Sequence, residues 1–217
     1  MSRRLRSEPV RQLIHQLEER ICRSETGDNL VWMIDGKPLV ISGCSSDRQA
    51  GYGRATGGKA KGYKLHAIVG SNGAVAEWRV APMNVDERRM ARRMLLTATI
   101  FGYVLGDGNY DSNRLHEVCD ERDNLQFVTP RRYGAGRGFG HRKQTPGRLR
   151  SVEILETPFS DFGEGLMIQR LEIERFFSKL SSTSGGLTHL PPWIRTHRRV
   201  HRWVKAKLII NSIRCRI

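Results

Sequence analysis

The hydrophobic residues near the start of the chain recur with helical spacing. Over residues 9–23 they fall on one face of a helix, with a proline near its beginning, which predicts a short amphipathic helix. The same spacing predicts four more helices. They cover residues 86–96 (with Asn84 or Asp86 as N-cap), 112–122, 166–181 and 196–213.

Short apolar runs and alternating apolar and polar residues predict the strands. Residues 63–69 alternate, a Ser-Asn-Gly turn follows, and residues 74–81 return, which predicts a hairpin with Lys64 and His66 on its polar face. Residues 30–34 and 39–41 are predicted strands, with Asp35-Gly-Lys-Pro38 as a turn or bulge between them. The remaining predicted strands cover residues 103–106, 125–129 and 151–157.

Two connecting segments have an unusual composition. Residues 43–62 are rich in Gly, Ser, Lys and Arg, which predicts a mobile basic loop, and residues 131–150 are expected to form an irregular loop. A hairpin followed by alternating helices and strands predicts a mixed α/β sheet covered by helices. The chain of 217 residues is long enough for one domain with a real core, and we expect it to span residues 30–217 after an N-terminal helical segment, residues 1–29.

The composition is that of a folded protein, with 38% hydrophobic and 27% charged residues. No apolar run approaches the roughly 20 residues that span a bilayer. The basic first residues lead into no hydrophobic signal region, so we expect a cytoplasmic protein without membrane contact.

Metal sites built on cysteine or histidine are not favoured. The four cysteines are scattered without paired spacing, which argues against both a disulfide framework and a Cys-based zinc site. His197 and His201 share a face of the last predicted helix, but no acidic or cysteine partner is near in sequence. DNA contact or a plain surface explains this pair better than zinc.

The formal net charge of +15 says more about possible partners than the composition does. Neither the chain after Glu174 nor the stretch 130–152 contains an acidic residue, and both are rich in Arg and Lys. Such runs neutralise phosphates and release counterions, so binding weakens steeply with salt. The charge therefore favours a nucleic acid as partner, although by itself it does not choose between DNA and RNA.

Two aspartates stand where apolar runs end. Asp107 follows residues 103–106, and Asp35 follows residues 31–34. A carboxylate at the rim of a sheet is costly unless a cation or a donor meets it, so two such acids suggest one shared metal site. Asp-Gly is also a common turn pair, and the alternative is that each aspartate only opens a turn.

A third acid, Glu174, lies on the apolar face of its predicted helix with Ile173 and Phe177. Arg170 stands one turn earlier, so an ion pair within the helix is one explanation. The other is that Glu174 joins Asp35 and Asp107. Three carboxylates suit Mg²⁺ or Mn²⁺ and hold two such ions about 4 Å apart in sites that cleave phosphodiesters.

Four stretches in this order resemble bacterial insertion sequence transposases of the DDE class. They are the strand that ends at Asp35, Gly62-Tyr-Lys-Leu-His66, Leu105-Gly-Asp-Gly-Asn-Tyr-Asp-Ser112 and Arg170-Leu-Glu-Ile-Glu-Arg-Phe-Phe177. The resemblance covers the chain from about Leu30 onward. It implies a ribonuclease H-like fold and a catalytic domain in which Asp35, Asp107 and Glu174 bind Mg²⁺ or Mn²⁺.

The resemblance also implies a reaction and partners. The reaction is hydrolytic nicking at transposon ends, followed by attack of the freed 3′-hydroxyl on target DNA. The partners are double-stranded DNA and a second copy of the chain in the active complex, and the place is the nucleoid. The residues expected to hold DNA are Arg170 by resemblance, Lys64, Arg131 and Arg132 by charge, and His66 and Arg175 beside them.

Two departures from the family pattern leave alternatives open. Met167 and Ser181 stand where one large branch has a Tyr and a Lys that grip phosphate. The chain also begins too close to Asp35 to hold the end-recognition domain of many relatives, which favours an N-terminally truncated copy or half of a frameshifted gene. The alternatives to an active transposase are an inactive, DNA-binding remnant and a ribonuclease H-like nuclease.

Overall fold

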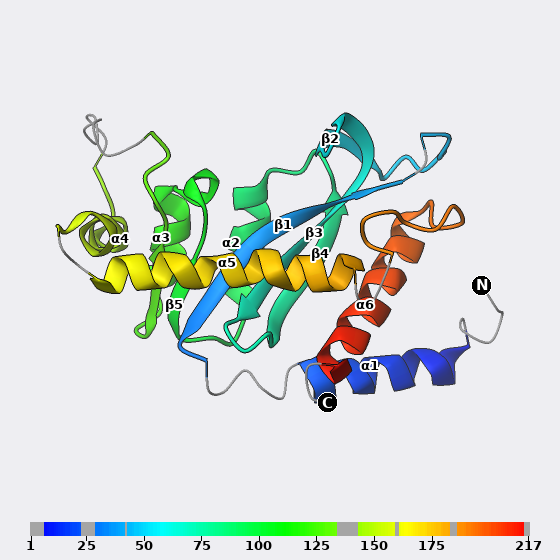
Figure 1. Ribbon diagram of the computed structural model, residues 1–217, viewed down its shortest axis with the longest axis horizontal. Coiled ribbons are helices and arrows are strands. Elements are labelled where there is room, and N and C mark those ends of the chain that lie inside the picture. Colours follow the sequence, from blue (N-terminus) through cyan, green and yellow to red (C-terminus); the bar gives the residue numbers. More distant parts are fainter. Residues whose placement is uncertain are drawn as a thin grey trace.

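The computed structural model describes residues 7–22, 29–41, 43–133, 143–158, 161–182 and 186–214 (Figure 1). In these ranges a six-stranded sheet is surrounded by helices. The helices are α1 Glu8–Cys22, α2 Glu87–Thr97, α3 Asn113–Asp120, α4 Pro146–Glu156, α5 Asp161–Ser182 and α6 His197–Arg214, with a short 3₁₀ turn, η2, at Gly108–Tyr110. The strands are β1 Val31–Val40, β2 Gly51–Ala55, β3 Gly58–Gly70, β4 Val75–Pro82, β5 Gly102–Leu105 and β6 Leu125–Val128.

Strand β1 lies at the centre of the sheet. It pairs antiparallel with β3 on one side and parallel with β5 on the other, and β6 continues the parallel part beyond β5. β3 is long enough to pair also with β4 and, through its first residues, with β2. The mixed α/β sheet predicted from the sequence is confirmed.

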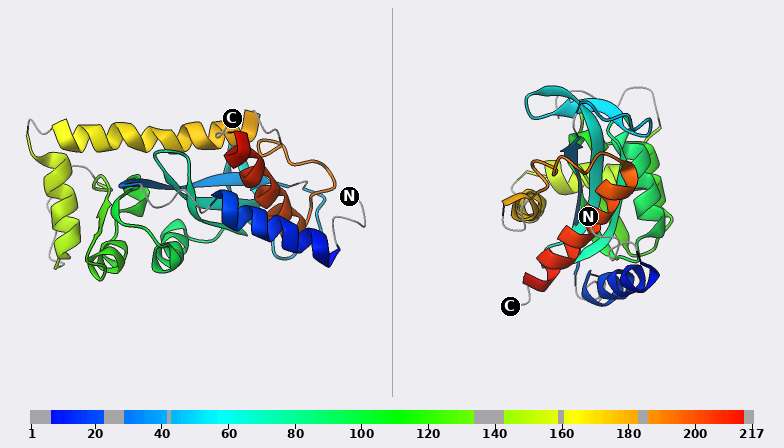
Figure 2. Two further views of the ribbon diagram at one scale, coloured as in Figure 1. Left: turned by 90° about the horizontal axis from the view of Figure 1, so that it is seen from below. Right: turned by 90° about the vertical axis from the view of Figure 1, so that its right-hand side faces the viewer.

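The side chains of β1 alternate between two hydrophobic cores. Met33 and Leu39 belong to the first, together with Ile173 of α5 and Val204 of α6. Helices α5 and α6 therefore cover one face of the sheet, which Figure 2 shows edge-on in its left view. By alternation, Asp35 also points to this face.

The second core lies on the opposite face. Trp32 and Ile34 of β1 pack there with Met94 of α2 and Leu115 of α3, and all four are at most 2% exposed. A central strand covered on both sides needs apolar residues at nearly every position, and β1 meets this requirement up to Ile34. Asp35 is therefore the first charged residue after this buried run, and residues 36–38 that follow it in β1 are half-buried.

The predicted turn at Asp35-Gly36 is wrong, because β1 continues through both residues. Asp35 pairs with Ala67, Gly36 with His66 and Lys37 with Leu65, so β3 provides a complete ladder for the strand. Tertiary pairing outweighs the turn preference of an Asp-Gly pair here.

The predicted basic loop over residues 43–62 is also wrong in its second half. Residues 51–55 form β2, which returns as β3 through a turn in which Gly57 and Gly58 have φ values of 89° and 120°. Only glycine adopts these values without strain, so the glycines that suggested a loop are the residues that make a hairpin.

The predicted strand over residues 151–157 is part of α4. The Thr145 side chain accepts a hydrogen bond from the Arg148 N–H, and Pro146 begins the helix, so local capping outweighs the β-branched residues that follow. The Ser151 hydroxyl then joins α4 to the sheet edge through the backbone of Thr129. Residues 134–142 of the predicted irregular loop lie outside the described residues.

Packing of α5 on the sheet can be tested with two isoleucines on that helix. Ile173 is fully buried and Ile168 is 67% exposed. We expect Ile173→Ala to lower the free energy of unfolding by about 2–5 kcal/mol, because it leaves a cavity against β1. Ile168→Ala should change it by less than about 0.5 kcal/mol. Urea denaturation measures both, and equal losses would contradict this packing.

Candidate active site

Asp35 and Asp107 lie at the same end of the parallel strand pair. Met33 is in register with Leu105, where β5 ends, so Asp107 follows β5 by the same number of residues as Asp35 follows Met33. The Asp107 carboxylate opens η2 and accepts a hydrogen bond from the Asn109 N–H at 2.8 Å. The two aspartates therefore lie near each other, but only Asp107 stands beyond the end of its strand, because β1 continues past Asp35.

The electrostatics of Asp35 reflect this placement. Burial is the main cause that raises its pKa to about 6, and the negative charges of Asp107 and Glu87 contribute to the same rise. The Gly36 N–H, which donates to Asp35 at 2.7 Å, and the Arg170 guanidinium act in the opposite direction. Asp35 is thus a half-buried carboxylate with acidic neighbours, whose ionised form lacks full compensation.

Arg170 of α5 connects Asp35 to the third predicted acid. Its charge acts on Asp35, and its guanidinium donates to Glu174 at 3.3 Å. The ion pair within the helix, which was one of the two explanations for Glu174, is therefore present. The Glu174 side chain is 59% exposed. Within the described ranges, no three or more His, Cys, Asp or Glu side chains form a group that could hold a metal ion.

Two residues near Asp35 were missed by the sequence analysis. Glu87, in the first turn of α2, acts electrostatically on Asp35 and forms an ion pair with Lys64. Tyr110 is 1% exposed, and its hydroxyl has no hydrogen-bond partner among the described residues. Burial raises the pKa of Tyr110 well above its ordinary value, and Asp35, Glu87 and Asp107 add to this effect. The acidic helix start at Asp86-Glu87 was the signal that could have revealed Glu87.

The hairpin residues Lys64 and His66 do not lie on an open polar face, which corrects the prediction. The Lys64 side chain is only 14% exposed beside Glu87, and His66 is 1% exposed. Burial and the nearby Lys64 charge lower the pKa of His66 to about 4, so it is neutral at pH 7. The reason is that α2 covers this face of the hairpin, and the sequence pattern of the strand alone does not reveal a covering helix.

The three other predicted DNA contacts have different surroundings. Arg131 is paired with Glu156 and its side chain is 12% exposed, so its charge is already largely compensated. Arg132 is exposed and stacks its guanidinium over the Tyr133 ring at 5.6 Å. The Arg175 side chain is 68% exposed and pairs with Glu172.

A buried ion pair supports the turn that carries Asp107. Arg148 of α4 donates to both oxygens of Asp111, at 2.6 and 2.7 Å, and the Arg132 N–H donates at 3.1 Å. Burial acts to raise the pKa of Asp111, but the hydrogen bonds from Arg148 and the Arg132 N–H, with the His116 ring nearby at 3.8 Å, hold it well below its usual range. This network fixes the segment after β6 against the segment after β5.

The predicted histidine pair on α6 has a structural environment. The rings of His197 and His201 are 6.2 Å apart, and His201 also stacks on Trp78. His197 lies within hydrogen-bonding distance of the Val80 carbonyl, and its backbone N–H donates to Asp47. Packing of α6 on β4 thus accounts for both residues.

Sequence comparison decides the family. A family model described as transposase DDE domain matches residues 44–160, which is more than half of the chain. The chain belongs to the transposase DDE-domain family. The match includes Asp107, whereas Asp35 and Glu174 lie outside it on either side. A search of curated proteins found no match.

Among solved structures, this DDE-domain chain is similar to the catalytic domain of the Mos1 mariner transposase. The sequences are 11% identical, the alignment covers 99% of this chain and 93% of that chain, and the TM-score is 0.30. The mixed sheet flanked by helices that was expected from the sequence is confirmed by the strand order and the helices around it. No helix within the described ranges is long and apolar enough to cross a membrane.

The raised pKa of Asp35 predicts a pH-dependent stability in buffer without divalent metal. The folded state holds the Asp35 proton more tightly than the unfolded chain, so this residue lowers the free energy of unfolding as pH rises from about 4 to about 6. We expect Asp35→Asn to stabilise the protein by roughly 1–3 kcal/mol at pH 8, with the gain disappearing below pH of about 4. Urea denaturation across pH measures this, with the exposed Asp123→Asn as control. A gain that does not depend on pH would contradict the assignment.

Proposed function

We propose that this chain cleaves DNA strands at transposon ends and transfers them into target DNA, in a reaction that depends on Mg²⁺ or Mn²⁺. The observation that carries the proposal is that Asp35, within β1, and Asp107, just after β5, lie near enough for the Asp107 charge to raise the pKa of Asp35. Membership in the transposase DDE-domain family supports DNA as the substrate.

Two of the three proposed metal ligands, Asp35 and Asp107, suit a divalent metal as they lie in the structure. Asp35 and Asp107 offer hard oxygen ligands, and their mutual repulsion is relieved by a cation. Glu174 lies one turn after Arg170 on α5, and the Arg170 charge acts on Asp35. When bound, a divalent cation supplies activation of the attacking oxygen and charge balance on the leaving oxygen.

In this proposal Arg170 and Glu174 exchange partners. The exposed Glu174 side chain leaves Arg170 at little cost, since an exposed ion pair within a helix contributes only about 0.3–0.5 kcal/mol. Glu174 then completes the acidic set, and the Arg170 guanidinium becomes available for a phosphate oxygen of the DNA. The active complex is proposed to be a homodimer, because joining two transposon ends requires two active sites.

A second function is favoured by one observation, the Arg170–Glu174 ion pair. If this pair is permanent, the chain is an inactive remnant that binds DNA through its positive charge and does not cleave it. A ribonuclease H-like nuclease differs from both, because it cleaves DNA with no preference for transposon ends.

Replacing either aspartate separates the transposase from the remnant. We expect Asp35→Asn and Asp107→Asn each to reduce Mn²⁺-dependent nicking of terminal inverted-repeat DNA by at least about 100-fold, because each removes a charged ligand. Salt-sensitive binding to the same DNA should persist. The exposed Asp123→Asn is the control and should keep full activity. Wild-type protein that binds but never nicks would support the remnant, and nicking of unrelated DNA at the same rate would support the nuclease.

The role of Glu174 can be tested against a neighbour on the same helix. Glu172 and Glu174 each pair with one arginine of α5, Arg175 and Arg170 respectively. We expect Glu174→Gln to lower nicking by at least about 100-fold and Glu172→Gln to leave it within about threefold. Both variants keep a side chain of the same shape, so thermal unfolding should show little change. Equal activity of the two variants would exclude Glu174 from the acidic set.

A further inference from the structure

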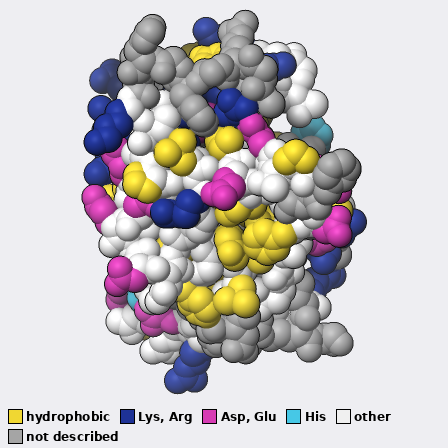
Figure 3. Space-filling model, turned by 90° about the vertical axis from the view of Figure 1, so that its left-hand side faces the viewer, with side chains coloured by type: hydrophobic (Ala, Val, Ile, Leu, Met, Phe, Trp, Pro, Cys, Tyr) yellow, Lys and Arg dark blue, Asp and Glu magenta, His cyan; other side chains and the backbone are white. Residues whose placement is uncertain are grey.

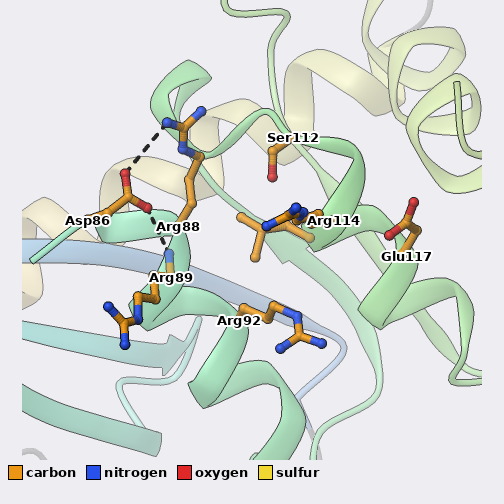
Figure 4. A pocket seen from close by; sticks show the side chains of 8 residues that line it. Asp86, Arg88, Arg89, Arg92, Ser112, Arg114 and Glu117 are labelled. Carbon is orange, nitrogen blue, oxygen red and sulfur yellow. Dashed lines mark hydrogen bonds and ion pairs between the residues drawn. The ribbon is translucent and has the colours of Figure 1, made fainter. Parts of the chain in front are cut away.

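A hollow of about 770 Å³ lies between the beginnings of α2 and α3. Arg88, Arg89 and Arg92 of α2 line it on one side and Arg114 of α3 on the other (Figure 4). We call these four residues and the space between them the arginine groove. Its lining also includes Ser112 and two acids, Asp86 and Glu117.

The positive charge of the groove arginines is only partly compensated by ion pairs within the protein. Arg88 pairs with Asp86 at 3.5 Å. Arg89, Arg92 and Arg114 are exposed, and none of them forms an ion pair with the described residues. Arginines gathered without acidic partners repel one another, and an anionic ligand relieves this repulsion.

The start of α3 adds donors on the same side. Asp86 caps α2 by accepting from the Arg89 N–H, whereas the Ser112 hydroxyl makes no such hydrogen bond at the start of α3. The first backbone N–H groups of α3 are therefore not satisfied by a side-chain cap. Unsatisfied N–H groups and the helix dipole together favour a phosphate at such a position.

The groove adjoins the candidate active site through the chain itself. α3 follows η2, which Asp107 opens, and α2 begins at Glu87, whose charge acts on Asp35. The face shown in Figure 3 carries apolar and acidic side chains between its Lys and Arg residues.

We propose that the arginine groove binds the sugar–phosphate backbone of double-stranded DNA, next to the part of the duplex that lies at Asp35 and Asp107. The choice of DNA as the polyanion rests on the proposed function. Arg88 and Arg92 are one helical turn apart, about 6 Å along α2, so the groove reaches more than one phosphate. One guanidinium group can donate two parallel hydrogen bonds to the oxygens of a phosphate. Such contacts bind the DNA backbone without recognising the base sequence.

Binding measured without divalent metal tests the groove independently of cleavage. The variant is Arg89→Gln/Arg92→Gln, and the control is Arg20→Gln/Arg198→Gln, which removes the same charge from exposed positions on α1 and α6. For a duplex of about 30 base pairs, the slope of log affinity against log salt should become shallower by about 1.8 in the groove variant. Between 50 and 200 mM salt, wild-type affinity should then fall about 12-fold more than that of the variant.

The outcomes separate the groove from the catalytic proposal. Equal slopes for the groove variant and wild type, or equal changes in the groove and control variants, would overturn the groove. If the groove variant alone loses slope, the groove stands even where wild-type protein fails to nick DNA. Failure to nick overturns only the transposase activity.

A third variant tests the same surface by strengthening it. Glu117 is exposed in the groove, and its charge opposes that of a phosphate backbone. Glu117→Gln should therefore tighten duplex binding at low salt, whereas Glu121→Gln, an exposed acid just after α3, should have a smaller effect. Unchanged or weaker binding by Glu117→Gln would contradict the path of DNA through the groove.

Discussion

The close approach of two carboxylates at one end of the sheet is the constraint on which the candidate site depends. The parallel pairing of β1 and β5 fixes Asp107 near Asp35, and burial leaves little solvent to screen their repulsion. The protein compensates this charge with Arg170 on the helix that crosses β1. Burial alone already disfavours the charged form of Asp35, and the second carboxylate adds to that effect, so the pair gives this end of the sheet its chemistry.

The net charge of +15 is divided between residues in ion pairs and residues that face solvent. Three basic residues form ion pairs that join helices to the sheet or to the segments beside it. The pairs are Lys64 with Glu87, Arg131 with Glu156 and Arg148 with Asp111. Other arginines, at the starts of α2 and α3, face solvent. Some basic residues therefore join parts of the fold and others face solvent, and the position of an acidic neighbour distinguishes them.

The elements that sequence predicted correctly are those with a strong local signal. Amphipathic spacing located α1, α2, α3, α5 and α6, and alternation located the hairpin of β3 and β4, because these patterns follow from one buried face. The errors had two causes, a partner distant in sequence in one case and local turn or capping residues in two others. β3 extends β1 through the Asp35-Gly36 pair, and two glycines shape the β2–β3 turn. At α4, a Thr-Pro cap outweighed β-branched residues.

The sequence by itself determined the mixed α/β class, the transposase resemblance and the two aspartates that follow apolar runs, because each depends on residues that are close together in the chain. The tertiary structure decided that His66 is buried, that Glu174 pairs with Arg170, and that Glu87 and Tyr110 adjoin the acids. These outcomes depend on which helix covers which face of the sheet. Burial and charge compensation are properties of neighbours in space, and a single strand or helix pattern does not name those neighbours.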